Sequence, residues 1–478
     1  MKKIFAFAVI LALLLPAAAF AAAEFTLGGF VKMDTYWSSV QDTHNMLTPI
    51  ARNNDTSFHH GQFKATAQGS RFNLTIKGPD LWGAKTSGFI EMDFDSEQEL
   101  GLGSANAISA SNNYKPRLRH AMFRFNWPTT ELLFGQYWSM FCEFYNESVQ
   151  DGPLQGHGMP TARLAQIRVS QMFGDGFTIA GLIGEPTAIA GATGGTPNYT
   201  IPNNAQNSET PQVQAKLQYQ KDLWGKAAYY GAPMPFTIRA IGGWQRNVMR
   251  NSTNAVANQV FTTNTFGQNT FGAANGLLSN NQYLNPWMAM VNVFLPVLPT
   301  HSANLAGTAS LSAQAYIGQG LGAFGDNMGN DVFAEFVQQV RVAGGNNPLA
   351  YEQQLYKKFG GYVQGQYYFT NQWFANVTGG LGRIYGVDRS VNAGAVSATN
   401  PAGFVWAGAD QPVSWTEVDF TLWYRPIQAF KFGLQYTWQR TAWLQTLSGG
   451  SGTGAAVGTN ASNVGNSSRV EFVGFFYF

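Results

Sequence analysis

The 478-residue sequence is poor in charged side chains and rich in aromatic residues and glycine. Charged residues make up 12% of the chain, against about 25% in soluble proteins, whereas it holds 36 Phe, 19 Tyr, 13 Trp and 53 Gly. The formal net charge is +2, and zero without Lys2 and Lys3 of a predicted leader, which gives no indication of a nucleic-acid partner. A single cysteine, Cys142, excludes an internal disulfide framework.

Residues 1–23 predict a cleaved secretory signal peptide. Met1–Lys3 is a short basic segment, residues 4–20 are apolar, and small residues at 19–23 supply a site for signal peptidase. A retained membrane helix is disfavoured because the apolar run is short and no polar stop-transfer flank follows it. We therefore expect residues 24–478 to be exported and to form one domain.

From residue 24 onward the chain repeats runs of about ten residues with alternating polarity, each followed by a turn. In the run 70–77, Phe72, Leu74 and Ile76 share one face and polar side chains share the other. Comparable runs follow at 89–95, 120–127, 132–140, 212–220, 361–369, 417–424 and 431–439. The apolar faces carry aromatics near their ends, and the polar faces hold more Gln, Lys, Arg and Glu than a packed core accepts. The pattern favours an all-β, transmembrane antiparallel β-barrel over a soluble β-sandwich.

The connections between these runs alternate between short turns and long polar segments. The short turns follow Gly78, Trp127, Phe173, Gln220, Val297, Phe369 and Arg425. The long segments are 38–69, 96–115, 141–162, 185–211, 247–284, 318–355, 387–413 and 444–467. Seven short periplasmic turns and eight long extracellular loops join sixteen strands, and an even number places both termini on the periplasmic side. Segments 226–246 and 284–317 leave 14 or 18 strands open as alternatives.

The C-terminal segment 470–478 predicts the closing strand of the barrel. Every second residue back from its end is apolar or small, and an aromatic final strand suits a barrel in which the last strand pairs with the first. We expect it to pair with residues 25–37. Phe475 and Tyr477 place aromatic rings on the opposite parity as well, so this pattern does not assign the two faces of the strand.

Five segments together resemble the DcaP-like family of outer-membrane porins. They are 27–34 (LGGFVKMD), 69–72 (GSRF), 88–94 (GFIEMDF), 118–121 (LRHA) and 133–141 (LFGQYWSMF). The resemblance implies a sixteen-stranded homotrimeric channel that passes small, often anionic, organic solutes. It implies no particular solute, because the C-terminal third carries no matching motif. Some family members have a helical segment before the first strand, whereas here the first strand is expected to begin at the cleavage site.

The third long connection, 141–162, is predicted to fold into the lumen as a constriction loop, since it combines acidic residues with several Gly and Pro. Its acidic residues are Glu143, Glu147 and Asp151. Strand parity predicts that the lumen is lined by the bases Arg71, His120, Arg124 and Arg168 and the acids Glu91 and Asp93. Acids on the loop opposite bases on the wall would set up a transverse field across the channel. Rim charges or local ion pairs are the alternative, and Arg119 falls on the outward parity unless a β-bulge shifts it.

No catalytic or metal-binding pattern emerges from the sequence: His59 and His60 lack further ligands at suitable spacing, and no serine-hydrolase elbow or P-loop occurs. We therefore expect a passive diffusion channel for small hydrophilic solutes and ions, without enzyme activity, cofactor or metal, in the lipid of a Gram-negative outer membrane. The arginines and the resemblance favour small organic anions, although composition does not fix the sign of selectivity. The alternatives are a structural or adhesion scaffold that acts through its long loops, and a barrel enzyme.

Overall fold

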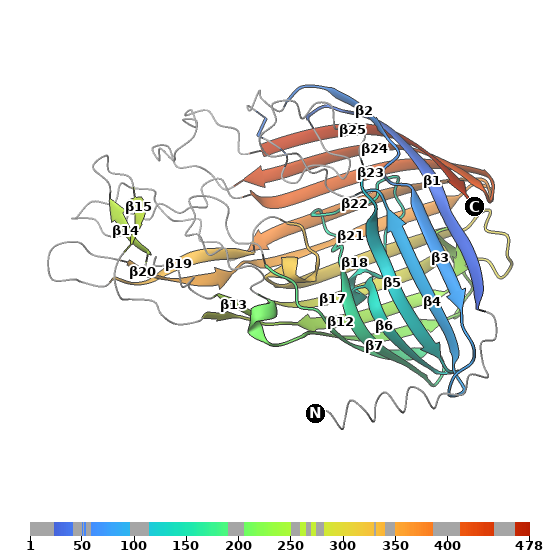
Figure 1. The fold of residues 1–478 in the computed structure, drawn as a ribbon. Coiled ribbons are helices and arrows are strands. Elements are labelled where there is room, and N and C mark those ends of the chain that lie inside the picture. Colours follow the sequence, from blue (N-terminus) through green and yellow to red (C-terminus); the bar gives the residue numbers. More distant parts are fainter. Residues whose placement is uncertain are drawn as a thin grey trace.

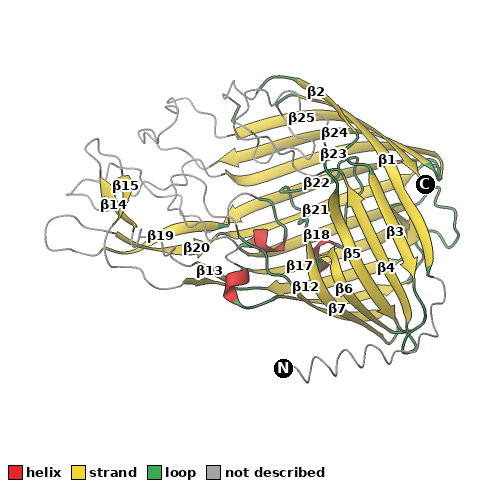
Figure 2. Cartoon of the chain, viewed as in Figure 1, coloured by secondary structure: helices red, strands yellow, loops and turns green. Residues whose placement is uncertain are grey.

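The computed structural model of the protein consists mainly of β-strands, with a few short helical turns (Figure 1; Figure 2). It describes residues 23–41, 50, 52–53, 59–95, 114–189, 205–249, 259–263, 269–273, 282–328, 331–339, 349–385, 412–443 and 464–478. Residues 1–22 of the predicted signal peptide and much of the long connections lie outside this part of the chain. Among the described residues, no helix is long and apolar enough to cross a membrane.

Seventeen described strands form one antiparallel sheet. They are β1 (Glu24–Ser38), β2 (Gln62–Thr66), β3 (Arg71–Lys77), β4 (Lys85–Asp93), β5 (Arg117–Asn126), β6 (Thr130–Trp138), β7 (Arg163–Phe173), β8 (Phe177–Gly184), β9 (Gln212–Lys221), β12 (Phe236–Trp244), β17 (Trp287–Leu298), β18 (Ala309–Gln319), β21 (Lys357–Tyr368), β22 (Trp373–Tyr385), β23 (Pro412–Ile427), β24 (Phe430–Trp443) and β25 (Val464–Tyr477). From β3 onward each strand pairs with the next, and β25 pairs with β1, so the sheet is closed.

The first two segments after β1 share one position in the barrel. β2 pairs with residues 34–38 of β1, and β3 pairs with residues 24–30 of the same strand. β2 and β3 are therefore two halves of a single broken strand, and the seventeen described segments make a sixteen-stranded barrel. The predicted fold class and strand number are confirmed, as is the predicted pairing of the C-terminal segment with the first strand.

Alternating polarity divides the side chains between the lumen and the outer surface. In β21, Val363 is 51% exposed on the outside whereas its neighbour Gln364 is 4% exposed on the inside. The same alternation assigns the faces of the terminal strand: Phe472 and Phe476 point outward, and Glu471 is buried inside. Stacked aromatic pairs such as Trp373 and Tyr424, with ring centroids 4.4 Å apart, lie on the outer surface near the strand ends.

Long and short connections lie at opposite ends of the barrel (Figure 1). At the extracellular end, pairs of strands extend the long connections beyond the wall. These pairs are β13 (Asn247–Met249) with β16 (Gln282–Leu284), β14 (Gln259–Thr263) with β15 (Asn269–Ala273), and β19 (Val332–Gln339) with β20 (Leu349–Leu355). At the periplasmic end, the expected short turn after Gln220 is wrong. The chain there forms an extra hairpin of β10 (Ala227–Tyr229) and β11 (Ala232–Met234), because Tyr230 and Gly231 adopt positive φ and close a two-residue loop.

A β-bulge in β5 turns one more arginine into the lumen. Glu91 pairs with His120 and Met92 pairs with Leu118, so Arg119 has no partner residue opposite it. Arg119 and His120 are both buried inside the barrel, whereas Leu118 is exposed outside. The β-bulge that would turn Arg119 inward, against the simple alternation of the strand, is therefore present in the structure.

The outward face tolerates charge less than the lumen face. Phe420 is 50% exposed on the outer surface of β23, and we expect Phe420→Arg to lower the free energy of unfolding in lipid vesicles by about 2–4 kcal/mol. Thr75→Arg places the same side chain on the partly exposed inner face of β3 and serves as the matched control. Urea unfolding of both variants measures the difference, and equal losses would contradict the assignment of the faces.

Candidate functional site in the barrel lumen

The segment 139–162 leaves the wall after β6 and folds into the barrel as a constriction loop. Its two ends are joined, because Ser139 N–H donates to the Ala162 carbonyl at 3.0 Å and Ala162 N–H donates to Cys142 Sγ at 3.1 Å. The loop opens with the short helix η2 (Met140–Cys142), whose Phe141 packs on Phe324 at a centroid distance of 5.4 Å. Burial raises the pKa of the Cys142 thiol to about 12, so this cysteine has a structural position rather than a reactive one.

Two loop acids attach the loop to opposite sides of the wall. Glu143 forms ion pairs with Arg168 of β7 and Lys216 of β9, and Glu147 pairs with Lys431 of β24. In the described barrel, eight strands separate β7 from β24 in one direction and six in the other. The segment between Glu143 and Glu147 therefore crosses the lumen.

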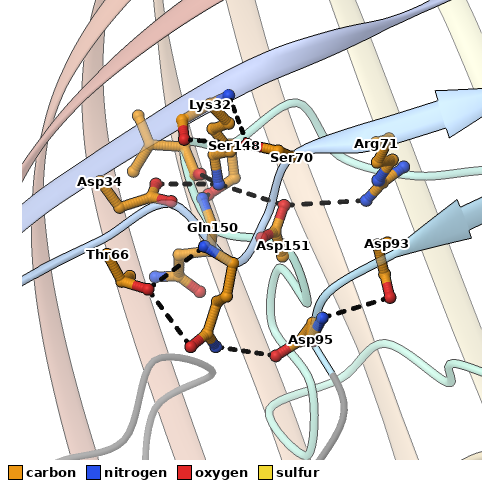
Figure 3. Close-up of polar contacts among 12 residues, drawn as sticks. Lys32, Asp34, Thr66, Ser70, Arg71, Asp93, Asp95, Ser148, Gln150 and Asp151 are labelled. Atoms are coloured by element: carbon orange, nitrogen blue, oxygen red, sulfur yellow. Dashed lines mark hydrogen bonds and ion pairs between the residues drawn. The ribbon is translucent and has the colours of Figure 1, made fainter. Parts of the chain in front are cut away.

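A third acid attaches the loop next to the closure of the barrel (Figure 3). Asp151 accepts from Lys32 Nζ of β1 at 3.1 Å and lies 3.7 Å from Arg71 of β3. The same Lys32 ammonium pairs with Asp34 at 2.9 Å and donates to the Val149 carbonyl at 2.8 Å. Lys32 is fully buried, and these oxygens compensate the desolvation of its charge.

The returning half of the loop lies against β21, β22 and β23. Gly158, at φ +118°, approaches so closely that a Cβ on it would lie 2.2 Å from the Gly361 carbonyl oxygen. His157 Nδ1 lies 3.1 Å from Glu417 of β23, and Gln150 donates to the same carboxylate at 3.3 Å. The loop thus covers Glu417, which is 1% exposed, and Asp419 beside it is buried to the same degree.

The water-accessible part of the inner wall lies on the opposite side. Inward side chains of β17, β18, β21, β22 and β23 are buried, whereas most of those on β3, β4, β5 and β6 are partly exposed. The side chain of Arg124 is 24% exposed there and that of Arg71 is 20% exposed. The loop therefore leaves a passage along β3–β6.

Arginines and aromatic rings alternate along this passage. Arg124 and Arg168 lie over the Tyr137 ring, at 4.9 and 5.3 Å from its centroid. Arg163 and Arg119 lie over the neighbouring Trp138 ring, at 4.8 and 5.7 Å. Stacking on an aromatic face leaves guanidinium N–H groups free to donate. Within the described residues, the buried N–H groups without a hydrogen-bond partner include Arg71 Nε, Arg124 Nε, Arg163 Nη1 and Arg168 Nε.

The residues predicted from strand parity all lie on the inner side, but with different surroundings. Arg168 is buried against Glu143. His120 is also buried, and the positive charges of several nearby arginines act on its ring. Arg119 pairs with Glu91 at 2.7 Å and also contacts Asp93. Arg117 pairs with Asp93 at 2.7 Å, and Arg124 lies 3.6 Å from Glu131. We expected the loop acids to stand across the channel from the bases; instead they contact Arg168, Lys216, Lys431, Lys32 and Arg71 directly.

Several residues of the site were not singled out by the sequence. Lys32, Lys216, Arg239 and Lys431 lie at inward positions of their strands, so alternation alone was a sufficient signal for them. Arg163 is different, because it stands at the start of β7, where the strand meets the loop, and it faces Trp138 directly across the β6–β7 pairing. Among the described residues, no group of three or more His, Cys, Asp or Glu side chains could hold a metal ion.

The closed sixteen-stranded barrel with a long loop across its lumen is the fold of a porin. Of the solved structures, the outer-membrane channel DcaP of Acinetobacter baumannii shares this fold with a TM-score of 0.60 over 96% of this chain and 99% of that one, at 16% identity. The anion-selective porin from Comamonas acidovorans and Salmonella typhi OmpF in complex with daunomycin follow, with TM-scores of 0.48 and 0.47 at 9% identity; they cover 95% of this chain and 100% and 97% of theirs. No protein-family model and no curated protein matches the sequence. The resemblance drawn from the sequence is confirmed in the fold.

The ion pairs of Glu143 predict how the loop responds to acid. Burial alone would raise the pKa of Glu143, but Lys216, Arg168 and Arg239 outweigh it and lower this pKa from 4.5 to about 2. A lowered carboxyl pKa stabilises the folded state fully above the unfolded value and loses this contribution as the pH falls from about 4.5 towards 2.

We therefore expect quiet single-channel currents between pH 8 and 5 and growing current noise below about pH 4. Glu143→Gln removes the charge at every pH and should be noisy throughout. The control is Glu131→Gln, which alters a carboxylate of β6 that the loop does not use. A quiet Glu143→Gln channel would mean that this acid does not hold the loop.

Proposed function

We propose that the protein is a passive diffusion channel of the outer membrane for small hydrophilic solutes, with a preference for small organic anions. The observation that carries the proposal is the unequal exposure of charge inside the barrel. The wall acids Glu417, Asp419 and Glu471 are buried, whereas Arg71 and Arg124 face the remaining passage, where Glu131 is paired with Arg124.

The partly exposed guanidinium groups of Arg71 and Arg124 support the anion preference. A guanidinium group that stacks on Tyr137 or Trp138 keeps its N–H donors directed to the side of the ring, where a carboxylate oxygen can accept from them. Several weak contacts in a row suit permeation, because each solute must bind well enough to enter and weakly enough to leave. An apolar solute would displace water from the arginines without offering them a hydrogen-bond acceptor, and this desolvation disfavours its passage.

The proposed setting follows from the fold and the leader. The predicted signal peptide would export the chain, and the apolar outer face of the barrel would contact outer-membrane lipid. A homotrimer is the assembly that the DcaP-like resemblance implies, and we propose it for this chain. We propose no enzyme activity, cofactor or nucleic-acid partner.

Planar bilayers test the channel itself. The purified protein should give a large ohmic current whose reversal potential under a salt gradient indicates anions. Absence of current would contradict the channel function and favour the alternative, a structural or adhesion scaffold that acts through its long loops.

Arg124→Glu tests the origin of the ion preference. Arg124 is partly exposed in the passage, so reversing its charge should shift the reversal potential towards cations. The loop should stay in place, because the partner of Arg124 at 3.6 Å is Glu131 of the wall and not an acid of the loop. Lys221→Glu is the matched control, since it makes the same change of charge at an exposed pair with Asp175 near the periplasmic rim. An equal shift in both variants would show that the narrow passage does not set the preference.

A further inference from the structure

We propose that the hairpin β10–β11 is an inner part of the channel that blocks the β12–β23 half of the lumen and supports the constriction loop from the periplasmic side. Solutes are then forced along the arginine-lined wall of β3–β6. The part of this inference that concerns ion preference rests on the proposed function, whereas the part that concerns channel width does not.

The hairpin is built as a rigid unit rather than a slack turn. Its two-residue loop, Tyr230-Gly231, has φ values of 50° and 77°, the combination that keeps the twist of the flanking strands. Its base is fixed to the neighbouring turn, because Lys226 and Thr300 exchange backbone hydrogen bonds of 2.9 and 2.7 Å. The segment before the hairpin is also fixed to β17, because the Trp224 indole N–H donates to the Pro296 carbonyl at 2.8 Å.

Two tyrosines attach the hairpin to the backbone of the constriction loop. The Tyr229 hydroxyl accepts from Tyr145 N–H at 3.0 Å and donates to the Tyr145 carbonyl at 3.1 Å. The Tyr230 hydroxyl donates to the Asn146 carbonyl at 2.7 Å. The Phe144 and Tyr229 rings stack with 4° between their planes and a centroid distance of 5.2 Å. Burial raises the pKa of Tyr229 to about 12, so its hydroxyl stays protonated and able to donate.

These contacts fall on the part of the loop that crosses the lumen. Glu143 and Glu147 attach the loop to opposite walls, and residues 144–146 lie between those attachments. In the described structure the Tyr145 and Asn146 backbone groups bonded by the two tyrosines lie within this crossing segment. The hairpin therefore supports the crossing segment at its middle.

The other side of the hairpin fills space against the wall. Ser310 of β18 donates to the Ala228 carbonyl at 3.0 Å, and Tyr229 contacts Phe294 of β17 at a centroid distance of 5.6 Å. Ala227 and Ala228 are buried, the first in an apolar cluster with Phe144, Phe294 and Tyr362, and the second in a cluster with Val149, Tyr368, Phe374 and Trp423. Loop and hairpin thus pack in two apolar clusters against the wall of β17 to β23, whose inward side chains, many of them polar, are buried.

The register of the wall provides a clean deletion. Lys221 and Phe236 are direct partners across β9 and β12, so replacing residues 222–235 with Asn-Gly closes a two-residue turn between strands that already pair. Heat-modifiable mobility on gel electrophoresis checks that the barrel still folds. We expect the conductance of this variant to rise about twofold, because a second route opens under the loop, and the reversal potential to move towards zero.

The two readouts separate the two ideas. An unchanged conductance overturns the blocking role of the hairpin, whatever the ion preference of the wild-type channel. A rise in conductance with an undiminished anion preference overturns the steering role alone. If the unaltered protein shows no anion preference, the proposed function fails while the conductance of the deletion variant still decides the blocking role.

The double variant Tyr229→Phe and Tyr230→Phe serves where the deletion fails to fold. It removes the three hydroxyl contacts to the loop and keeps the rings and the hairpin. We expect normal heat-modifiable mobility with more frequent transitions between conductance levels, because the crossing segment loses its support. Tyr219→Phe alters a tyrosine of β9 that packs against Phe177 and Phe236 and is the control. Currents as quiet as those of the control would overturn the supporting role.

Discussion

The interior of this barrel depends on ion pairs between the acids of one loop and bases on widely separated strands. Glu143 binds Arg168 and Lys216, Glu147 binds Lys431, and Asp151 binds Lys32 and lies near Arg71. Because the charges are largely removed from water, pairing adds less stability than its Coulomb energy suggests, but loss of one partner leaves an uncompensated charge and costs about 3–5 kcal/mol. The pairs are therefore better suited to fixing where the loop lies than to stabilising the barrel.

The position of the loop decides which charges meet water. It lies over Glu417 and its neighbours on β23 and leaves the wall of β3–β6 partly exposed. A chain whose residues 24–478 hold equal numbers of acidic and basic side chains can thus expose arginines on one part of its inner wall. The sign of the field in a narrow channel depends on which charges remain unpaired and hydrated there, and the total charge has little influence on it.

Apolar packing completes what the ion pairs begin. Phe144 stacks on Tyr229, Val149 packs with Trp423, and the hairpin joins the loop to the wall of β17 and β18. The inner side of this barrel is consequently a packed core over one half and a hydrated wall over the other. Close packing resists displacement of the loop, since no side chain can move without opening a void or colliding with its neighbour.

The sequence by itself determined the elements whose signal is local and periodic. Alternation with period two assigned the strands, the lengths of the connections assigned the two ends, and the aromatic C-terminal strand predicted closure onto the first. The inward parity of Arg71, Arg124 and Arg168 was also readable, because each stands within a regular strand.

Only the tertiary structure decided which inward charges are paired and which half of the lumen is open. Arg119 turns inward because of a bulge in the pairing of β5 with β4, and Arg163 lies over Trp138 because the register of β6 and β7 sets the two residues opposite each other. The hairpin after β9 was missed because its loop, Tyr230-Gly231, lacks the Asn-Gly or Asp-Gly signal. The hydroxyls of Tyr229 and Tyr230 find their partners more than eighty positions away in the chain. Contacts of that separation leave no periodic trace in the sequence, because each depends on where the whole barrel brings the two segments together.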